Sequence, residues 1–307
     1  MKNTLKFFGI VTMAVFISFA ITVCERSPDE NNPSNNNTPD TPTTPGNPTN
    51  PDTPTNPDIP TTPLNPNASG VKTYTGNGKA ALPGSSYHYE MWTASGNGNK
   101  LIWYGPNQGG GAAFKAEWNN ANDYLGRIGY FWGNGGLFTQ YKNMYADFNY
   151  TRSGRNTAGD YSYIGIYGWA RNPGASDANE KLIEYYIVED WFGNQWQSDA
   201  FPVGTNTTQG SVTGSYTMDG AAYSVIKNVR TNAPSIDGTK TFTQYFSIRQ
   251  TLRKSGTISI TEHFRKWDEI GMKLGNMYEA KFLVEAGGGT GWLDFTYLKL
   301  SQEDNPR

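Results

Sequence analysis

Apolar and polar residues alternate with a period of two along most of the chain beyond residue 71, which is the pattern of half-buried β-strands. Turn residues recur between the alternating runs, and Asp219-Gly220 separates two of them as a two-residue hairpin turn would. The pattern predicts an all-β domain, a sandwich or jelly roll. The clearest predicted strands are residues 114–118, 161–169, 182–191, 215–218, 242–250, 257–260 and 292–300.

One segment that follows residue 260 has a helical period instead. Its apolar side chains recur every three or four residues, with Thr261 before them as an N-cap and Gly275 after them as a stop signal. The sequence therefore predicts one α-helix between these two residues, with an apolar stripe packed against a sheet. The stripe consists of Phe264, Trp267, Ile270 and Leu274.

The N-terminal residues differ in character from the β-rich part. Residues 1–23 combine Lys2 and Lys6 with an apolar run that is short for a membrane span, which is the pattern of a secretory signal. Cys24, the only cysteine, follows directly, where a bacterial signal peptidase would leave a residue for lipidation. The residues before it lack the small side chain usual at such sites, so an ordinary cleaved signal is the alternative. We expect export from the cytoplasm, as a bacterial cell-surface lipoprotein or otherwise as a secreted protein.

Proline, threonine, asparagine and aspartate dominate residues 24–70, with hardly an apolar side chain. Such a segment cannot bury a core, and its proline density favours an extended spacer. We interpret it as a tether that holds a folded domain away from its point of attachment. The predicted organisation is a signal peptide (1–23), this tether (24–70), a folded domain (71–301) and a short C-terminal tail (302–307).

Composition narrows the range of functions. The formal net charge is −2 and no Lys/Arg cluster interleaves with the aromatic residues, so nucleic acid is not an expected partner. Aromatic residues make up 14% of the chain and their faces suit stacking on sugar rings, although core packing will claim many of them. His88 and His263, the two histidines, form no cluster for a metal site or a Ser/His nucleophile, and no cofactor is implied.

Two strand-like segments each place one carboxylate in an apolar or aromatic run, Glu184 and Glu285. Splitting a glycosidic bond needs one carboxyl to protonate the leaving oxygen and a second to attack the anomeric carbon or activate water. Alternation puts Glu184 on the same face as Tyr186 and Glu189 on the opposite face, so Glu189 is the poorer candidate. A solvated face is the usual fate of a lone strand glutamate, and it is the alternative to catalysis.

Longer motifs point to a particular family. Residues 167–169 read Tyr-Gly-Trp, residues 182–186 read Leu-Ile-Glu-Tyr-Tyr, and residues 230–238 read Arg-Thr-Asn-Ala-Pro-Ser-Ile-Asp-Gly. Together with residues 242–250 and 271–275, these motifs resemble the endo-β-1,4-xylanases of glycoside hydrolase family 11, with residues 230–238 in the place of the family's thumb hairpin. The resemblance implies a β-jelly roll of two twisted antiparallel sheets with one helix, shaped like a half-closed right hand with an open cleft. It makes the folded domain a xylanase catalytic domain.

The resemblance also implies catalytic roles. Glu184 would be the nucleophile and Glu285 the general acid/base of a reaction that retains configuration, which requires the two carboxyls to lie about 5 Å apart. Asp123 would be the hydrogen-bonding neighbour of the acid/base. In the family an aspartate there accompanies acidic optima, so we expect an optimum on the acidic side. The alternative for Asp123 is a turn residue with no catalytic coupling.

Contacts with a xylan chain follow from the same resemblance. Trp92 would stack on a xylose ring, and the thumb would cover the chain. Packing within the strands is the alternative, and it applies most to Tyr163 and Trp169, which share the face of Tyr167. The expected contact residues are Trp92, Tyr167, Trp169, Tyr186, Arg230, Pro234, Ser235, Ile236 and Gln244.

The chain departs from the family pattern at two places. Residues 174–181 are an insertion that suits a tolerated surface loop or an outer subsite, and residues 286–291 are a glycine-rich form of a loop that often carries a tyrosine.

Two rival functions are a non-catalytic glycan-binding lipoprotein and an enzyme that cuts glucans. The glutamate pair argues against the first, and the thumb sequence favours xylan as the partner. The oligomeric state is left open, with a monomer favoured.

Overall fold

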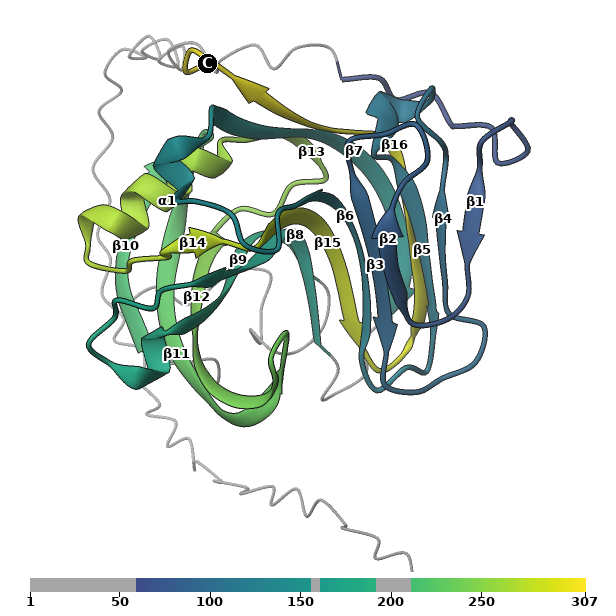
Figure 1. Cartoon of the computed structure of the whole chain (residues 1–307). Helices are drawn as coiled ribbons and strands as arrows, with labels where there is room; N and C mark the ends of the chain where they lie inside the picture. Colours follow the sequence, from purple (N-terminus) through teal and green to yellow (C-terminus); the bar gives the residue numbers. More distant parts are fainter. Residues whose placement is uncertain (1–58, 156–160, 192–210) are drawn as a thin grey trace, which may run out of the picture. The chain divides into compact units, whose positions relative to one another are not determined.

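In the computed structural model, which describes residues 59–155, 161–191 and 211–307, two β-sheets and a single α-helix make up the folded part (Figure 1). The prediction of an all-β domain with one helix is confirmed. Residues 1–58, which include the predicted signal, Cys24 and most of the predicted tether, lie outside the described residues. No helix in the described ranges has the length and apolarity needed to cross a membrane.

The strands are distributed unequally between the sheets. The smaller sheet has six strands, in the order β1 (Lys72–Tyr74), β4 (Lys100–Trp103), β5 (Phe114–Asn119), β16 (Thr290–Glu303), β7 (Asn143–Arg155) and β13 (Ser255–Ile258). The larger sheet has the order β10 (Ser211–Met218), β11 (Ala221–Ser235), β12 (Gly238–Arg249), β9 (Leu182–Asp190), β8 (Tyr161–Arg171), β15 (Glu279–Gly287), β6 (Tyr124–Phe131), β3 (His88–Thr93) and β2 (Gly78–Ala81), and β14 (Asn276–Met277) pairs with β8. Short 3₁₀ turns occur at Gly109–Gly111, Phe138–Gln140 and Ala178–Glu180.

One strand pair departs from the expected antiparallel arrangement. β12 runs parallel to β9, whereas the other pairs in the described ranges are antiparallel. A parallel pair requires a long connection, and here β10 and β11 lie between β9 and β12 along the chain. The consequence is local and important, because this pairing sets Gln244 directly beside Glu184.

Both faces of the larger sheet bury aromatic and aliphatic side chains, but for different purposes. Along β9, Ile183, Tyr185 and Ile187 point into the main core between the sheets, together with side chains of the smaller sheet such as Trp103 and Phe148. Intervening side chains on β9 belong to a second cluster on the opposite face. The alternation of side chains along β9 therefore separates two faces of the sheet that are both buried. Figure 1 shows the larger sheet curling, with the β11–β12 hairpin projecting from it.

The helix is shorter than the sequence predicts. α1 spans Ile260–Glu269, and Ser259 rather than Thr261 is the N-cap. Gly271 adopts a left-handed φ of +83°, its N–H bonds the Asp268 carbonyl, and the Met272 N–H reaches the Trp267 carbonyl at 2.8 Å. These two backbone hydrogen bonds form a Schellman motif, which ends a helix with a left-handed residue, usually glycine, directly after the C-cap. The predicted stop at Gly275 is therefore wrong, and the predicted strand over residues 257–260 ends at Ile258.

The shortened helix changes the fate of two stripe residues. Ile270, the C-cap, is 51% exposed, whereas Leu274 is buried in the core from a position beyond the helix. The predicted stripe is correct only for Phe264 and Trp267, which contact Tyr185 edge-on from the helix.

The predicted hairpin is confirmed between β10 and β11. Asp219 and Gly220 both have positive φ, +48° and +73°, and Met218 pairs with Ala221 across the turn. Two consecutive left-handed residues are the requirement of a type I′ turn, which matches the twist of the flanking strands.

Both ends of the predicted domain extend further than expected. Residues 59–70 of the predicted tether pack on the folded part: Asn65 and Gln108 exchange two hydrogen bonds, and Leu64 packs against the core. At the other end β16 continues to Glu303, and the Arg307 guanidinium lies 2.7 Å from the Asp147 carboxylate. The predicted tail of residues 302–307 is thus attached to the smaller sheet.

Candidate active site

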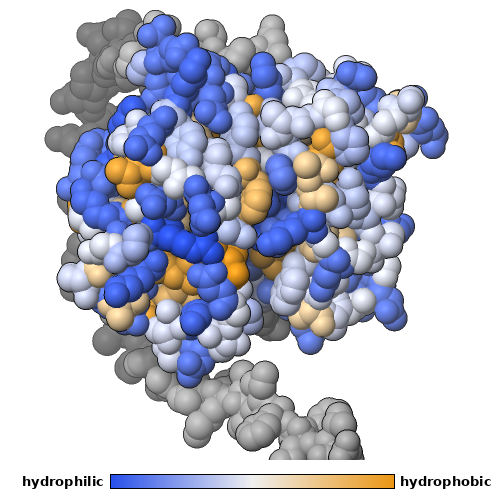
Figure 2. Space-filling view, in the orientation of Figure 1, coloured by the Kyte–Doolittle hydropathy of each residue, from blue (hydrophilic) through white to orange (hydrophobic). Residues whose placement is uncertain are grey.

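A cavity of about 450 Å³ lies on the concave face of the larger sheet, over β3, β6, β8, β9, β12 and β15 and beside the β11–β12 hairpin. Figure 2 shows strongly hydrophilic and hydrophobic residues side by side on this face of the domain. The lining combines four carboxylates with aromatic rings, a combination suited to binding and cutting a sugar polymer. The lining residues are Lys79, Glu90, Trp92, Asp123, Leu125, Arg127, Tyr161, Tyr163, Tyr167, Trp169, Glu184, Tyr186, Arg230, Pro234, Ser235, Ile236, Phe242, Gln244 and Glu285.

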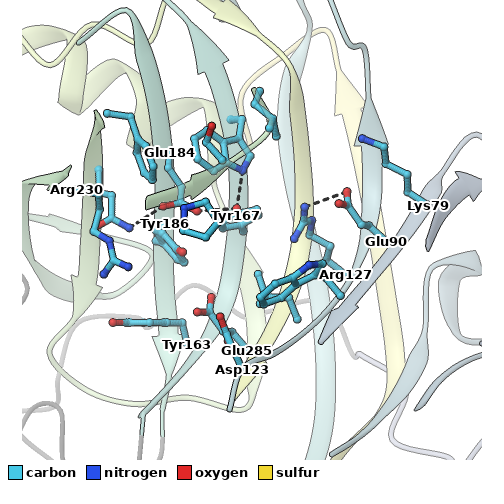
Figure 3. A pocket seen from close by; sticks show the side chains of 18 of the residues that line it. Lys79, Glu90, Asp123, Arg127, Tyr163, Tyr167, Glu184, Tyr186, Arg230 and Glu285 are labelled. Carbon is cyan, nitrogen blue, oxygen red and sulfur yellow. Dashed lines mark hydrogen bonds and ion pairs between the residues drawn. The ribbon is translucent and has the colours of Figure 1, made fainter. Parts of the chain in front are cut away.

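Glu184 is held by two donors. Its Oε1 accepts a hydrogen bond from the Tyr167 hydroxyl at 2.7 Å, and its Oε2 accepts one from the Gln244 amide at 2.6 Å (Figure 3). The Trp169 indole N–H donates in turn to the Tyr167 hydroxyl, which fixes the direction of that donor. Burial raises the pKa of Glu184, but hydrogen bonds from Tyr167 and Gln244 and the charge of Arg230 oppose that rise. The two donors therefore favour the ionised form of Glu184, while burial leaves its pKa above the ordinary value.

Glu285 has the opposite surroundings. It lies on β15 between Leu125 of β6 and Tyr163 of β8, and its buried Oε2 has no hydrogen-bond partner among the described residues. Burial, then the negative charges of Asp123 and Glu184, raise the pKa of Glu285 well above its ordinary value. A raised pKa favours the protonated carboxyl, which can give its proton to a substrate.

Asp123 lies directly before β6 and beside Glu285 (Figure 3). Burial is the main reason that its pKa is raised to about 6, and the charge of Glu184 adds to the rise, against a hydrogen bond from Tyr161 and the charge of Arg230. Its buried Oδ1 has no hydrogen-bond partner in the described part of the chain. Asp123 and Glu285 therefore titrate as a pair, in which ionisation of one makes ionisation of the other harder.

All the expected substrate contacts line this same cavity. Trp92 is 36% exposed, which is unusual for so large a ring and leaves part of it accessible for stacking on a sugar. Trp169 and Tyr163 are almost fully buried in the cluster on the cleft face. These two residues therefore pack against neighbouring strands and also line the cleft. At the tip of the hairpin, Asp237 is bonded to Arg171 at the end of β8, 2.6 Å away.

The sequence matches a known protein family over most of its length. Residues 84–296 match the model of Glycosyl hydrolases family 11. The chain belongs to this family. The resemblance inferred from the motifs is therefore confirmed, as is the jelly-roll fold.

Named relatives and solved structures agree with the family. Endo-1,4-beta-xylanase C of Fibrobacter succinogenes is 42% identical over 222 residues, which are 72% of this chain and 32% of that protein. Endo-1,4-beta-xylanase S20 of Neocallimastix patriciarum is 43% identical over 233 residues, 76% of this chain and 63% of that protein. The crystal structure of an ENZbleach xylanase mutant has a TM-score of 0.74 and 61% identity, covering 80% of this chain and 90% of that chain. This chain spans less than two thirds of the length of the two curated relatives.

Sequence reasoning missed a group of buried charges at one side of the family 11 cleft. The Arg127 guanidinium lies 2.9 Å from the Glu90 carboxylate and 3.4 Å from that of Glu279, and the Lys281 ammonium lies 2.6 Å from Glu279. Arg127 also stacks 4.6 Å from the centre of the Tyr167 ring. A signal existed, because Glu279 and Lys281 alternate in phase with Glu285 on β15, but it becomes visible only once the register across β3, β6 and β15 is known.

The insertion at residues 174–181 does not line the cleft cavity. It contains the 3₁₀ turn Ala178–Glu180, whose start is capped by Asp177. The Asn179 carbonyl accepts from the Thr243 hydroxyl of β12 at 3.0 Å, and Glu180 forms an ion pair with Lys227 of β11. The insertion therefore braces the two strands that carry the thumb hairpin.

Proposed function

We propose that this chain is an endo-1,4-β-xylanase that hydrolyses internal bonds of xylan with retention of configuration. The observation that carries the proposal is the contrast between two cleft carboxyls. Glu184 accepts two hydrogen bonds, which suit the ionised state, whereas the buried Oε2 of Glu285 has no hydrogen-bond partner among the described residues, which suits the protonated state. Opposite protonation states of two carboxyls are what acid-assisted cleavage of a glycosidic bond needs. The xylanases among the relatives favour xylan as the substrate.

The reaction then has two steps. A Glu184 oxygen bonds to the anomeric carbon while the glycosidic C–O bond breaks and the Glu285 proton moves to the leaving oxygen. With the charge of Glu184 consumed, the pKa of Glu285 falls, and its carboxylate takes a proton from water. The water oxygen bonds to the anomeric carbon, the bond to Glu184 breaks, and both carboxyls return to their starting states.

The direct test is release of reducing sugar from glucuronoxylan by the chain, with β-glucan as the control polymer and product stereochemistry followed by NMR. We expect release from xylan, with the β-anomer formed first. Xylan binding without release would favour a non-catalytic glycan-binding protein, and preferential cleavage of β-glucan would change the substrate.

The loss of activity at higher pH should be set by the ionisation of Asp123. Ionisation of Asp123, with a pKa of about 6, places a negative charge beside Glu285 and weakens it as an acid, so activity should fall above that pH. Replacing Asp123 with Asn removes this ionisation. The alkaline limb should then be set by Glu285, whose pKa burial and the charge of Glu184 still raise, and it should move to higher pH. The measurement is kcat/KM for xylan between pH 3 and 9 for both proteins. Superimposable profiles would remove Asp123 from the catalytic group.

We also propose that the chain is exported and that Cys24 carries a lipid anchor, because Cys24 follows a short apolar signal and precedes a spacer. Anchoring through more than one acyl chain would hold the enzyme at a cell surface, since a single chain binds membranes only marginally. In a bacterial host, the full chain should incorporate labelled palmitate and sediment with membranes, and Cys24→Ala should abolish both. Label-free, soluble export of the unsubstituted chain would favour an ordinary cleaved signal.

A further inference from the structure

The second donor to Glu184 works only in one orientation of the Gln244 amide. An ionised carboxylate accepts hydrogen bonds and offers none, so the NH₂ group of Gln244 must face it. The observed contact, from Gln244 Nε2 to Glu184 Oε2, satisfies this condition at 2.6 Å. The amide oxygen of Gln244 then points the other way and needs a donor of its own, because Gln244 is only 5% exposed.

Asn228 supplies that donor. Its side-chain NH₂ lies 2.8 Å from the Oε1 of Gln244. The three residues occupy one row across three neighbouring strands, because Asn228 on β11 pairs with Gln244 on β12, and Gln244 pairs with Glu184 on β9. Asn228 is absent from the lining of the cleft cavity, so it reaches the reaction only through Gln244.

We propose that Asn228 is a positioning residue that selects the orientation of the Gln244 amide and thereby secures the second hydrogen bond to the nucleophile Glu184. The inference rests on the proposed function, since Glu184 is the nucleophile only if the chain is a retaining glycosidase. Without Asn228, a rotation of the amide by half a turn would set two oxygens against each other at Glu184. Loss of a hydrogen bond to the charged form raises the pKa of a carboxyl.

Two substitutions test the idea in different ways. Asn228→Leu removes the donor at nearly constant size, and Asn228→Asp offers only acceptors, which favours the reversed amide. For Asn228→Asp we expect kcat to fall about tenfold or more, the equivalent of one hydrogen bond to a charged group, with KM little changed. The acidic limb of the pH profile should move to higher pH, because Glu184 must be ionised to attack. Asn228→Leu should show the same changes to a smaller degree.

Asn134→Asp is the matched control. It changes the net charge equally on an exposed residue that is absent from the cavity lining, so its activity and pH profile should equal those of the unsubstituted chain. Equal behaviour of Asn228→Asp and this control would overturn the proposal.

A double-mutant cycle separates positioning from a general disturbance of the thumb. In a Gln244→Leu background there is no amide to orient, so Asn228→Leu should have little further effect on kcat or on the acidic limb. Fully additive effects of the two substitutions would show that Asn228 acts by another route and would overturn the inference. If the unsubstituted chain released no sugar from xylan, the proposed function would fail; if it did and the cycle were additive, only the role of Asn228 would.

Discussion

Glu184→Gln is expected to abolish xylan hydrolysis, with kcat falling by about ten-thousand-fold or more, since the covalent intermediate cannot form without the proposed nucleophile. The fold should persist, because Gln has nearly the shape of Glu and the Tyr167 hydroxyl still finds an acceptor at the same position. The measurement is reducing-sugar release from glucuronoxylan, with circular dichroism and xylan binding as checks on folding. Glu117→Gln, on the smaller sheet and outside the cleft, is the matched control and should stay fully active.

Glu285→Gln should behave differently from Glu184→Gln, and the difference identifies the roles. An acid/base variant loses the proton donor for a poor leaving group but keeps the nucleophile. On an aryl xylobioside whose leaving group needs no proton, it should therefore form the covalent intermediate in a fast burst and then stall, because no base activates water. Glu184→Gln should show no burst. A burst in Glu184→Gln and none in Glu285→Gln would reverse the assignment.

The placement of these two glutamates in one cleft could be predicted because their signal is local. Each interrupts an apolar strand, and alternation alone separates Glu184, facing the cleft, from Glu189, which is buried on the core side against Tyr223 and Arg253. The helix end was misplaced by four residues because two glycines, Gly271 and Gly275, compete as stop signals. The choice between them depends on tertiary packing, which draws Leu274 into the core.

Other features depend on which strands are neighbours, and sequence periodicity carries no information about that. The parallel pairing of β12 with β9, which sets Gln244 beside Glu184, is one example. Asn228 is another, since its link to Gln244 exists only through the β11–β12 register. The packing of residues 59–70 on the domain could not be predicted, for a different reason. A proline-rich composition predicts a spacer even where single side chains, such as Leu64, pack against the core.

The buried charges beside the cleft lead to the second large effect, on stability. Arg127→Met is expected to lower the free energy of unfolding by about 3–5 kcal/mol, the cost of leaving a buried charge without its partner. Glu279 has no solvent-exposed surface and is neutralised by Arg127 and Lys281, while Glu90 draws on the same two cations. Removing one cation leaves two carboxylates sharing one ammonium. Urea unfolding followed by tryptophan fluorescence measures the change.

The pattern of rescue distinguishes charge balance from lost packing. If balance governs the effect, Arg127→Met combined with Glu279→Gln should be more stable than Arg127→Met alone, because the double variant again pairs one carboxylate, Glu90, with one ammonium. Lys142→Met provides the surface control: its partner Asp304 is exposed, so the loss should stay below about 1 kcal/mol. An equal loss of unfolding free energy in Arg127→Met and Lys142→Met would mean that water solvates the charged side chains beside the cleft. The stacked Arg127 would then be free to move away from Tyr167, and the Tyr167 donor to Glu184 would have to be fixed by the Trp169 indole alone.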